Sequence, residues 1–217
     1  MLSLKAGGKT YFLPPVIVLV LVPVLCRRFI IYYGGSPEGY IGASNMMQQL
    51  IPLLAVWWIM ILTQEIIDGP GREVYLFCDP GCRKTLRQCA VIFLWYLVHI
   101  AVAMLLVCTV MPSVGWIFLE LALQSLFFVG FYLLIGALLR KTGAALLLLM
   151  LYYVVMAYMD QTTKPWLKAI NVYNLGEIAN AHILRTHSVW VGAVGFVMAI
   201  LGWWLLRHPI MHSSSNV

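Results

Sequence analysis

Charged side chains are scarce in this chain. Of its 217 residues, 10% are charged and 62% are hydrophobic, and the mean hydropathy is +0.90. A soluble globule of this length needs more polar surface than such a composition supplies. The shortage of charge therefore excludes a soluble domain and indicates a polytopic integral membrane protein.

Complete motifs for nucleotide binding and hydrolysis are also lacking. Gly8-Lys9-Thr10 ends like the phosphate-binding loop G-x-x-x-x-G-K-[ST], but Ser3 stands where the first glycine belongs and no strand precedes it. No H-E-x-x-H sequence occurs. Gly42 to Asn45 resembles part of an intramembrane serine protease elbow but lacks the G-x-S-x-G frame. The sequence thus predicts no nucleotide site and disfavours hydrolases of these two types.

The few charges that are present concentrate between Gln64 and Cys89, QEIIDGPGREVYLFCDPGCRKTLRQC. This stretch holds four of the eight acidic and four of the fourteen basic residues. An apolar run long enough to cross a bilayer lies on each side of it, so the stretch sits at one membrane face. Four Lys and Arg residues in so short a loop predict that this face is cytoplasmic.

The excess of positive charge has a topological explanation. The net charge is +6, but the basic residues lie at the ends of apolar runs and form no single patch of the kind that binds phosphate backbones. No nucleic-acid partner is therefore expected. The five cysteines are Cys26, Cys78, Cys82, Cys89 and Cys108. On a cytoplasmic face the Cys78 and Cys82 thiols stay reduced, and without a second pair or a nearby histidine they do not predict a metal site.

The apolar runs predict an all-α fold with six transmembrane helices in one domain over residues 1–217, with both termini in the cytoplasm. The expected spans are about 11–33, 46–63, 89–111, 114–139, 144–159 and 189–206. Residues 34–44, rich in glycine and proline, predict an outer loop. Residues 160–188 carry many large apolar side chains, which predicts short amphipathic helices at the outer interface.

Residues 64–88 are expected to form a helical elbow at the cytoplasmic face. Gly69-Pro70-Gly71 ends the second span, Arg72 to Phe77 forms a short surface segment, and Asp79-Pro80-Gly81 breaks it. A second short helix from Cys82 to about Gln88 then leads into the third span. Such an elbow is suited to docking a partner.

Polar side chains inside the spans are candidate functional residues, because charge in a bilayer is expensive. Arg27 and Arg28 either anchor the helix at the interface or meet an anionic substrate or lipid headgroup. Glu120 and Gln124 lie one helical turn apart, where they form structural hydrogen bonds or line a substrate path. His99 is either a polar contact between helices or a ligand. Small residues on the last span, Gly192, Gly195, Ala199 and Gly202, predict close helix packing.

This layout resembles the type-two permease subunits of ATP-binding cassette (ABC) exporters. In that family a span ends in glutamate, and a glycine-containing turn, an amphipathic coupling helix, and a proline with nearby basic residues follow. The matching residues here are Glu65, Gly69-Pro70-Gly71, Arg72 to Phe77, Pro80 and Arg83-Lys84, together with a similar fourth-span exit, Leu134 to Lys141. Two departures are the short N-terminal arm and Asp79-Pro80-Gly81-Cys82 in place of the usual Leu-Pro turn.

The resemblance implies a non-catalytic subunit that binds no cofactor and pairs with a second permease, identical or related. ATP and Mg²⁺ would be bound by separate ABC ATPase subunits. It implies a plasma-membrane protein of bacteria, in contact with membrane lipids, that exports a peptide, a lipid or another amphipathic compound. The implied coupling interface consists of Glu65, Arg72, Glu73, Val74, Leu76, Phe77, Arg83 and Lys84. The candidate substrate pathway consists of Arg27, Arg28, His99, Glu120 and Gln124.

Two alternatives remain open on the sequence. Glu65 and Asp68 with Arg72 distantly suggest the acidic motif of glutamic intramembrane proteases, although no adjacent glutamate pair is present. An intramembrane hydrolase or processing protease is therefore the alternative enzyme hypothesis. A membrane scaffold without transport is the third.

Overall fold

The structure is a computed structural model that describes residues 11–70, 72, 77, 79, 83–111, 113–158, 171–176 and 179–207. Within these residues every regular element is a helix. In chain order they are α2 (Leu13–Val16), η2 (Ile17–Leu21), α3 (Val22–Tyr32), α4 (Pro37–Ile67), α6 (Arg83–Val107), α7 (Val114–Leu139), α8 (Thr142–Tyr158), α10 (Ala181–Ile183), η3 (Leu184–Ser188) and α11 (Val189–Arg207). The predicted all-helical fold is confirmed for the part of the chain described.

Five helical runs are long and apolar enough to cross a membrane: Leu13–Tyr32, Pro37–Ile67, Arg83–Val107, Val114–Leu139 and Ala181–Arg207. Helix α8 is apolar but has 17 residues. A hydrocarbon core of about 30 Å needs roughly 20 helical residues. Five candidate spans make the chain compatible with a multi-pass membrane protein, and the sixth span stays a prediction.

The first run contains Pro14, Pro15 and Pro23 and is not a regular α-helix throughout. Its middle part, η2, winds as a wide π-helical turn directly before Pro23 in α3. Proline has no N–H to donate to the preceding turn and its ring crowds the carbonyl four residues back. A widened turn at this place relieves that crowding while the helix continues to Tyr32.

The predicted outer loop at residues 34–44 is wrong over most of its length, because α4 begins at Pro37. Ser36 is the N-cap, and its Oγ accepts a hydrogen bond from Gly39 N at 3.4 Å. A capping serine followed by proline at the first helical position is a strong start signal, which outweighs the glycine-rich composition. The connection to α3 is therefore a tight turn in which Gly34 and Gly35 take positive φ values of 62° and 71°.

The expected short helix at 82–88 and the third span form one continuous helix, α6. The Asp79 carboxylate accepts hydrogen bonds from Lys84 N and Thr85 N, each at 3.2 Å, and from Thr85 Oγ1 at 3.3 Å. A carboxylate at this place satisfies free N–H groups and favours the positive end of the helix dipole. The predictions for Pro80 and for the Cys78 and Cys82 pair lie outside the described residues.

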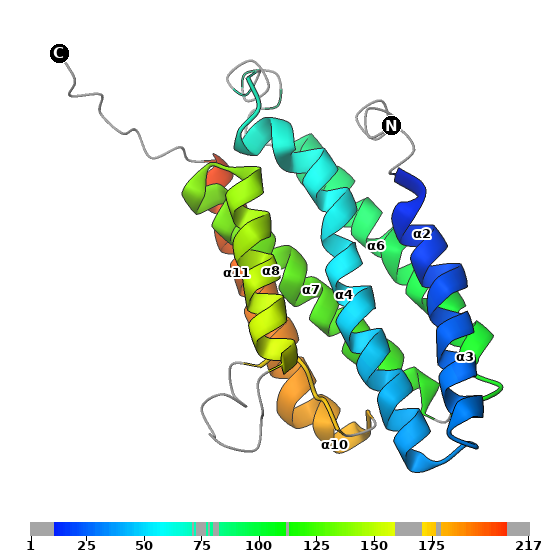
Figure 1. Cartoon of the computed structure of the whole chain (residues 1–217). Helices are drawn as coiled ribbons and strands as arrows, with labels where there is room; N and C mark the ends of the chain where they lie inside the picture. The colour runs from blue at the N-terminus through cyan, green and yellow to red at the C-terminus, as the bar shows by residue number, and fades with distance from the viewer. Residues whose placement is uncertain are drawn as a thin grey trace.

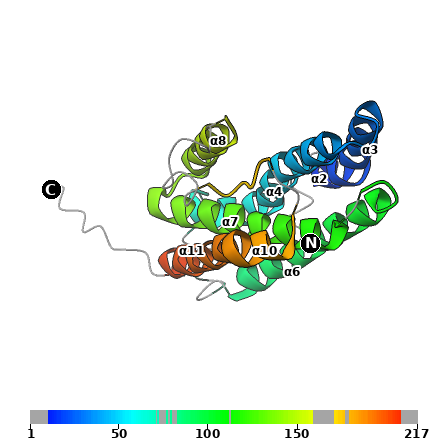
Figure 2. The ribbon, with the colours of Figure 1, turned by 90° about the horizontal axis from the view of Figure 1, so that it is seen from below.

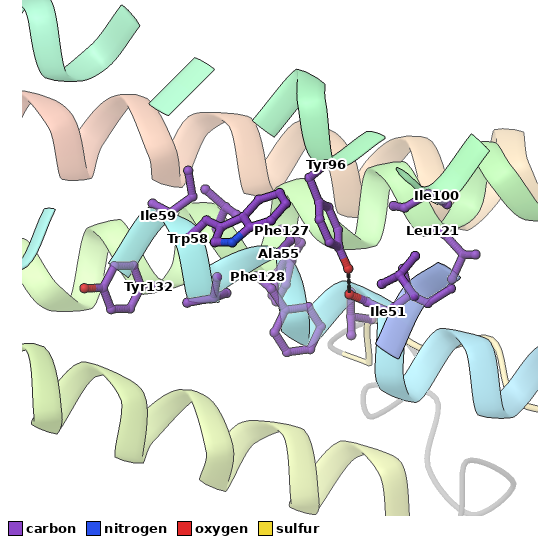
Figure 3. Packing of buried hydrophobic residues seen from close by; sticks show 14 of the residues in the cluster. Ile51, Ala55, Trp58, Ile59, Tyr96, Ile100, Leu121, Phe127, Phe128 and Tyr132 are labelled. Carbon is purple, nitrogen blue, oxygen red and sulfur yellow. Dashed lines mark hydrogen bonds between the residues drawn. The ribbon is translucent and has the colours of Figure 1, made fainter. Parts of the chain in front are cut away.

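Helices α4 and α7 form the centre of the bundle, and the other long runs surround them (Figures 1 and 2). In the most apolar part of each of these two helices 61% of residues are buried, against 28% in each of the other three candidate spans. Aromatic and branched side chains fill the space between them, as Figure 3 shows for Trp58, Phe128 and Tyr132. The Tyr96 hydroxyl of α6 donates to Ile51 O of α4 within this core (Figure 3).

The last span packs closely on α7, as its small residues predicted. A Cβ atom added to Gly195 would lie 2.4 Å from Phe127 Cα, and one added to Gly202 would lie 2.6 Å from the Leu133 carbonyl carbon. The facing residue on α7 is Gly130, where a Cβ would lie 2.0 Å from Gly195 O. The two backbones touch, so the positions of Gly130, Gly195 and Gly202 leave no room for a Cβ atom.

One end of the bundle holds the first residues of α2 and α6, the last residues of α4 and α11, and the turn from α7 to α8 (Figure 1). We call this the elbow end, marked by Ile67, Arg83 and Arg140, and we call the other end, marked by Tyr32, Pro37 and Ala181, the opposite end. Arg83, Arg140 and Arg207 lie at this end, as the predicted grouping of basic residues requires, whereas the N-terminal lysines lie outside the described residues. That the elbow end faces the cytoplasm stays a prediction.

Candidate functional site

A buried network of amides joins α4, α7 and the segment 171–176 in the half of the bundle nearer the opposite end. At its centre Gln48 Oε1 accepts hydrogen bonds from Gln124 Nε2 and from Asn174 N, both at 3.0 Å. Gln48 Nε2 donates to Ser44 Oγ and to Asn174 O, both at 3.4 Å. Gln124 Nε2 uses its second proton on Val172 O at 3.1 Å. The Gln48 side chain thus links two central helices to one chain segment.

Segment 171–176 is irregular and its first three residues are buried, so the short surface helices expected across 160–188 are wrong at these residues. Asn171 Nδ2 donates to Met156 O at 3.1 Å, and Asn171 Oδ1 accepts from Tyr173 N at 2.9 Å. A nitrogen of the His187 ring lies 2.8 Å from Asn171 O. Burial also raises the pKa of the Tyr173 phenol. The segment is fixed in place by polar bonds to the helices around it.

Residues 181–188 also differ from the expected interfacial helix. They form α10 and η3, which continue into α11 as one run that ends at Arg207. Asn180 caps its start, because its Oδ1 accepts from His182 N and Ile183 N at 3.0 Å each. This cap starts the helical run eight residues before the predicted span. The remainder of the predicted interfacial segment, 160–170 and 177–178, lies outside the described residues.

Glu120 is fully buried in α7, one turn before Gln124. Neither carboxyl oxygen has a hydrogen-bond partner, and Gln124 Oε1 has none either. One of our hypotheses expected a hydrogen bond between Glu120 and Gln124, and the structure has none. Gln124 bonds to Gln48 of α4 instead. Buried polar groups in native proteins are almost always paired, so an unpaired carboxyl in a central helix calls for a functional explanation.

His99 has a structural environment. Its Nδ1 lies 2.8 Å from Trp95 O in the same helix, and its ring meets Trp95 and Trp58 edge to face with centroids 5.1 and 5.5 Å apart. The hydrogen bond is within α6, and only the ring contact with Trp58 crosses to α4. These contacts favour a packing role over a ligand role.

The arginines of α3 lie at the surface. Arg27 and Arg28 are both exposed, and Arg27 Nη2 donates to Thr109 Oγ1 at 3.0 Å. Exposed arginines near a helix end are typical of interfacial anchors. The structure therefore favours the anchoring hypothesis over contact with a substrate inside a cavity.

Residues of the predicted coupling interface lie at the elbow end. Glu65, Arg83 and Lys84 are exposed, Arg72 is half-buried, and Phe77 is 85% exposed. Glu73, Val74 and Leu76 lie outside the described residues. Phe77 is therefore a candidate docking residue, a large aromatic side chain exposed on a face that carries charged residues.

The residues of the hydrolase hypothesis, Glu65, Asp68 and Arg72, all lie at the elbow end, and Asp68 and Arg72 line one pocket there. Among the histidines that the structure describes, none is near them. Glu65 is near the end of α4 at the elbow end, whereas His99 is sixteen residues into α6, about 24 Å along that helix at ~1.5 Å per residue. In the part of the chain that the structure describes, no three His, Cys, Asp or Glu side chains are placed to hold a metal ion.

Sequence reasoning found Glu120 and Gln124 but missed their neighbours Ser44, Gln48, Asn171 and Asn174. Gln48 had a usable signal, because it is an amide inside an apolar run, where such groups bond between helices. Asn171 and Asn174 had none, since nothing in a polar connecting sequence shows that it folds inward.

The fold and this network are compatible with a multi-pass helical membrane protein that has buried polar groups between its two most buried helices. No protein-family model, curated protein or solved structure that we compared with the chain matches it. Its function must therefore be argued from its own residues.

The amide network supports a first prediction. We expect Gln48→Leu to lower the free energy of unfolding by about 1.5 kcal/mol, because Asn174 N loses its acceptor and Gln124 loses one of two. Unfolding by sodium dodecyl sulfate in mixed micelles, followed by tryptophan fluorescence, measures this change. Gln49→Leu is the control, since Gln49 is only partly buried. Equal stability of the two variants would contradict the role of Gln48.

Proposed function

We propose that this chain is the membrane-spanning permease subunit of a type-two ABC exporter. The observation that carries the proposal is Phe77, which is 85% exposed at the elbow end between the end of α4 and the start of α6. Arg83 and Lys84, which are both exposed, lie on the first turn of α6. An apolar anchor bordered by charges is the usual make-up of a protein-docking site.

The link between this site and the interior supports coupling. Helix α4 is one unbroken element of 31 residues that connects the elbow to Gln48 and the buried amide network. A push from an ATPase at the elbow would move α4 along or about its axis, and the network would have to rearrange. Nucleotide-driven closure of a partner can reach the spans only through contacts on this face.

Assembly with further subunits also fits the surface. Outward-facing apolar side chains cover α6, α8 and α11, among them Leu94, Trp95, Leu147, Trp190 and Phe196. We propose that a second permease subunit, identical or related, covers part of this surface and membrane lipids cover the rest. ATP and Mg²⁺ would bind to the ATPase partner, in the plasma membrane of a bacterium. The substrate class is a peptide, a lipid or another amphipathic compound.

Purification tests the proposal directly. We expect the tagged chain, extracted in mild detergent from its native host, to retain a stoichiometric ATP-binding subunit that mass spectrometry identifies and whose ATP hydrolysis can be assayed. Phe77→Asp is expected to reduce retention at least about tenfold, because a charge replaces an apolar anchor at the interface.

The matched control is Tyr158→Asp, since Tyr158 is also 85% exposed but ends α8 at the opposite end. It is expected to retain the ATPase as the wild type does. A chain that purifies alone, without ATP hydrolysis, would overturn the transporter proposal. Retention that Phe77→Asp leaves unchanged would keep a transporter but remove Phe77 from its coupling site.

A further inference from the structure

A basic pocket lies at the elbow end, where α4 ends and α7 turns into α8. Its volume is about 680 Å³, and its charged lining residues are Asp68, Arg72, Arg140 and Lys141. The lining therefore carries two more positive than negative charges. The lining is completed by Ile67, Gly69, Gly143 and Ala144.

The two arginines hold buried donors without acceptors. Arg72 Nε and Nη2 are buried and have no hydrogen-bond partner, and the same is true of Arg140 Nη1. The other terminal nitrogen of Arg140, Nη2, donates to Leu205 O of α11 at 3.2 Å, which fixes the guanidinium group. A guanidinium N–H removed from water needs an acceptor, and the forked donor pattern of arginine matches the oxygens of phosphate.

The only carboxylate among the described lining residues is occupied elsewhere. Asp68 Oδ2 accepts from Thr142 N at 2.9 Å, and Asp68 Oδ1 accepts from Thr142 Oγ1 at 2.6 Å. Asp68 thus ties the end of α4 to the start of α8 and does not pair with either arginine. The Asp68 carboxylate therefore caps the start of α8, and the unpaired N–H groups of Arg72 and Arg140 remain available to another acceptor.

The backbone at Arg140 gives a further indication. Arg140 ends α7 with φ of 54° and ψ of 30°, in the left-handed region, and its N–H donates to Gly136 O at 2.9 Å. Glycine is the usual residue at such a helix end. Arg140 adopts a backbone conformation that favours glycine, and it contributes a charge that glycine would not.

We propose that this pocket binds a phosphate-bearing anion through Arg72 and Arg140, with Lys141 adding positive charge at its rim. Two sources supply this chemistry at the end of a membrane-spanning bundle: the headgroup of an anionic phospholipid, and free phosphate from solution. The proposal does not depend on the transport function, since it rests on donors and charge within this chain alone.

The test compares two variants of equal net charge. Arg72→Gln with Arg140→Gln removes both forked donors, whereas Arg83→Gln with Arg87→Gln removes two exposed arginines of α6 outside the pocket. Each protein is reconstituted in nanodiscs of phosphatidylcholine with phosphatidylglycerol, released, and analysed by native mass spectrometry for retained lipid. The pocket variant is expected to retain about tenfold less phosphatidylglycerol than the wild type, and the control to match the wild type.

A second arm uses inorganic phosphate and measures the thermal shift of the detergent-purified proteins. Phosphate protection of the wild type but not of the pocket variant, without preferential lipid retention, would assign the site to free phosphate. Equal behaviour of the wild type and the pocket variant in both arms overturns the proposal. If the double variant fails to fold, Arg72→Gln is compared with Arg87→Gln, which has the same net charge, because Arg72 makes no hydrogen bond through its buried nitrogens Nε and Nη2.

Discussion

Gly195→Val is expected to lower the free energy of unfolding by about 3 kcal/mol, the upper part of the range for overpacked interiors. The added Cβ would lie 2.4 Å from Phe127 Cα and 2.6 Å from Phe127 N. Both are backbone atoms of a central helix, so no side-chain rotation relieves the clash. The two helices must move apart, and the close contact along Gly130 and Gly202 is lost with them.

Detergent titration of the purified chain, followed by tryptophan fluorescence, measures this loss. Gly115→Val is the matched control, because it makes the same substitution in a long helix at a site with nothing within 4 Å of the added Cβ. We expect it to change stability by less than about 1 kcal/mol, mostly through helix propensity. Equal stability of the two variants would show that α7 and α11 do not pack through their glycines.

Most of the fold could be predicted from the sequence, because the signal for a membrane helix is local. The apolar runs located all five candidate spans, and they placed Leu13–Tyr32 and Val114–Leu139 to within two residues at each end. The errors lie where a cap decides the boundary. Ser36 starts α4 and Asn180 starts the run into α11, each earlier than hydrophobicity indicates. A hydropathy window cannot detect one side chain that bonds to two backbone groups.

The buried site could be predicted only in part. Polar residues within a span are visible in the sequence, and this was enough to select Glu120 and Gln124. Their partners depend on how the helices are rotated about their axes, which no local pattern specifies. Gln124 therefore bonds to Gln48 of α4 and to Val172, and not to the glutamate one turn away. The inward course of segment 171–176 likewise depends on tertiary packing, which no local sequence pattern specifies.

The two ends of the α4 and α7 pair are stabilised differently. Toward the opposite end, amide bonds join both helices to segment 171–176. At the elbow end, Asp68 bonds to Thr142 across the turn that follows α7, in the same pocket as buried nitrogens of Arg72 and Arg140 that lack acceptors. A phosphate-bearing anion bound there would supply the missing acceptors and hold this end together. Anion binding and movement of α4 are thus expected to influence each other, because the end of α4 lines the same pocket as Arg72 and Arg140.

Glu120→Leu and Gln124→Leu are expected to change stability in opposite directions, although the two residues lie one turn apart on one helix. Glu120 is fully buried and its oxygens make no hydrogen bond, so leucine removes an unsatisfied group and should raise the free energy of unfolding by about 2 kcal/mol. Gln124 donates to Gln48 and to Val172, so leucine leaves two buried acceptors short of a donor and should lower it by about 2 kcal/mol.

The same detergent titration separates the variants by an expected difference of about 4 kcal/mol, the sum of these two changes. Each replaces a polar side chain by leucine at a buried site of α7, so the comparison removes the general effect of added hydrophobicity. Destabilisation by Glu120→Leu would mean that the carboxyl group is satisfied, and its assignment as a candidate pathway residue would fail. Stabilisation would show that the fold retains Glu120 at a cost to its own stability. A fold keeps such a group when its activity needs it, which makes Glu120 the first residue to substitute once a substrate is known.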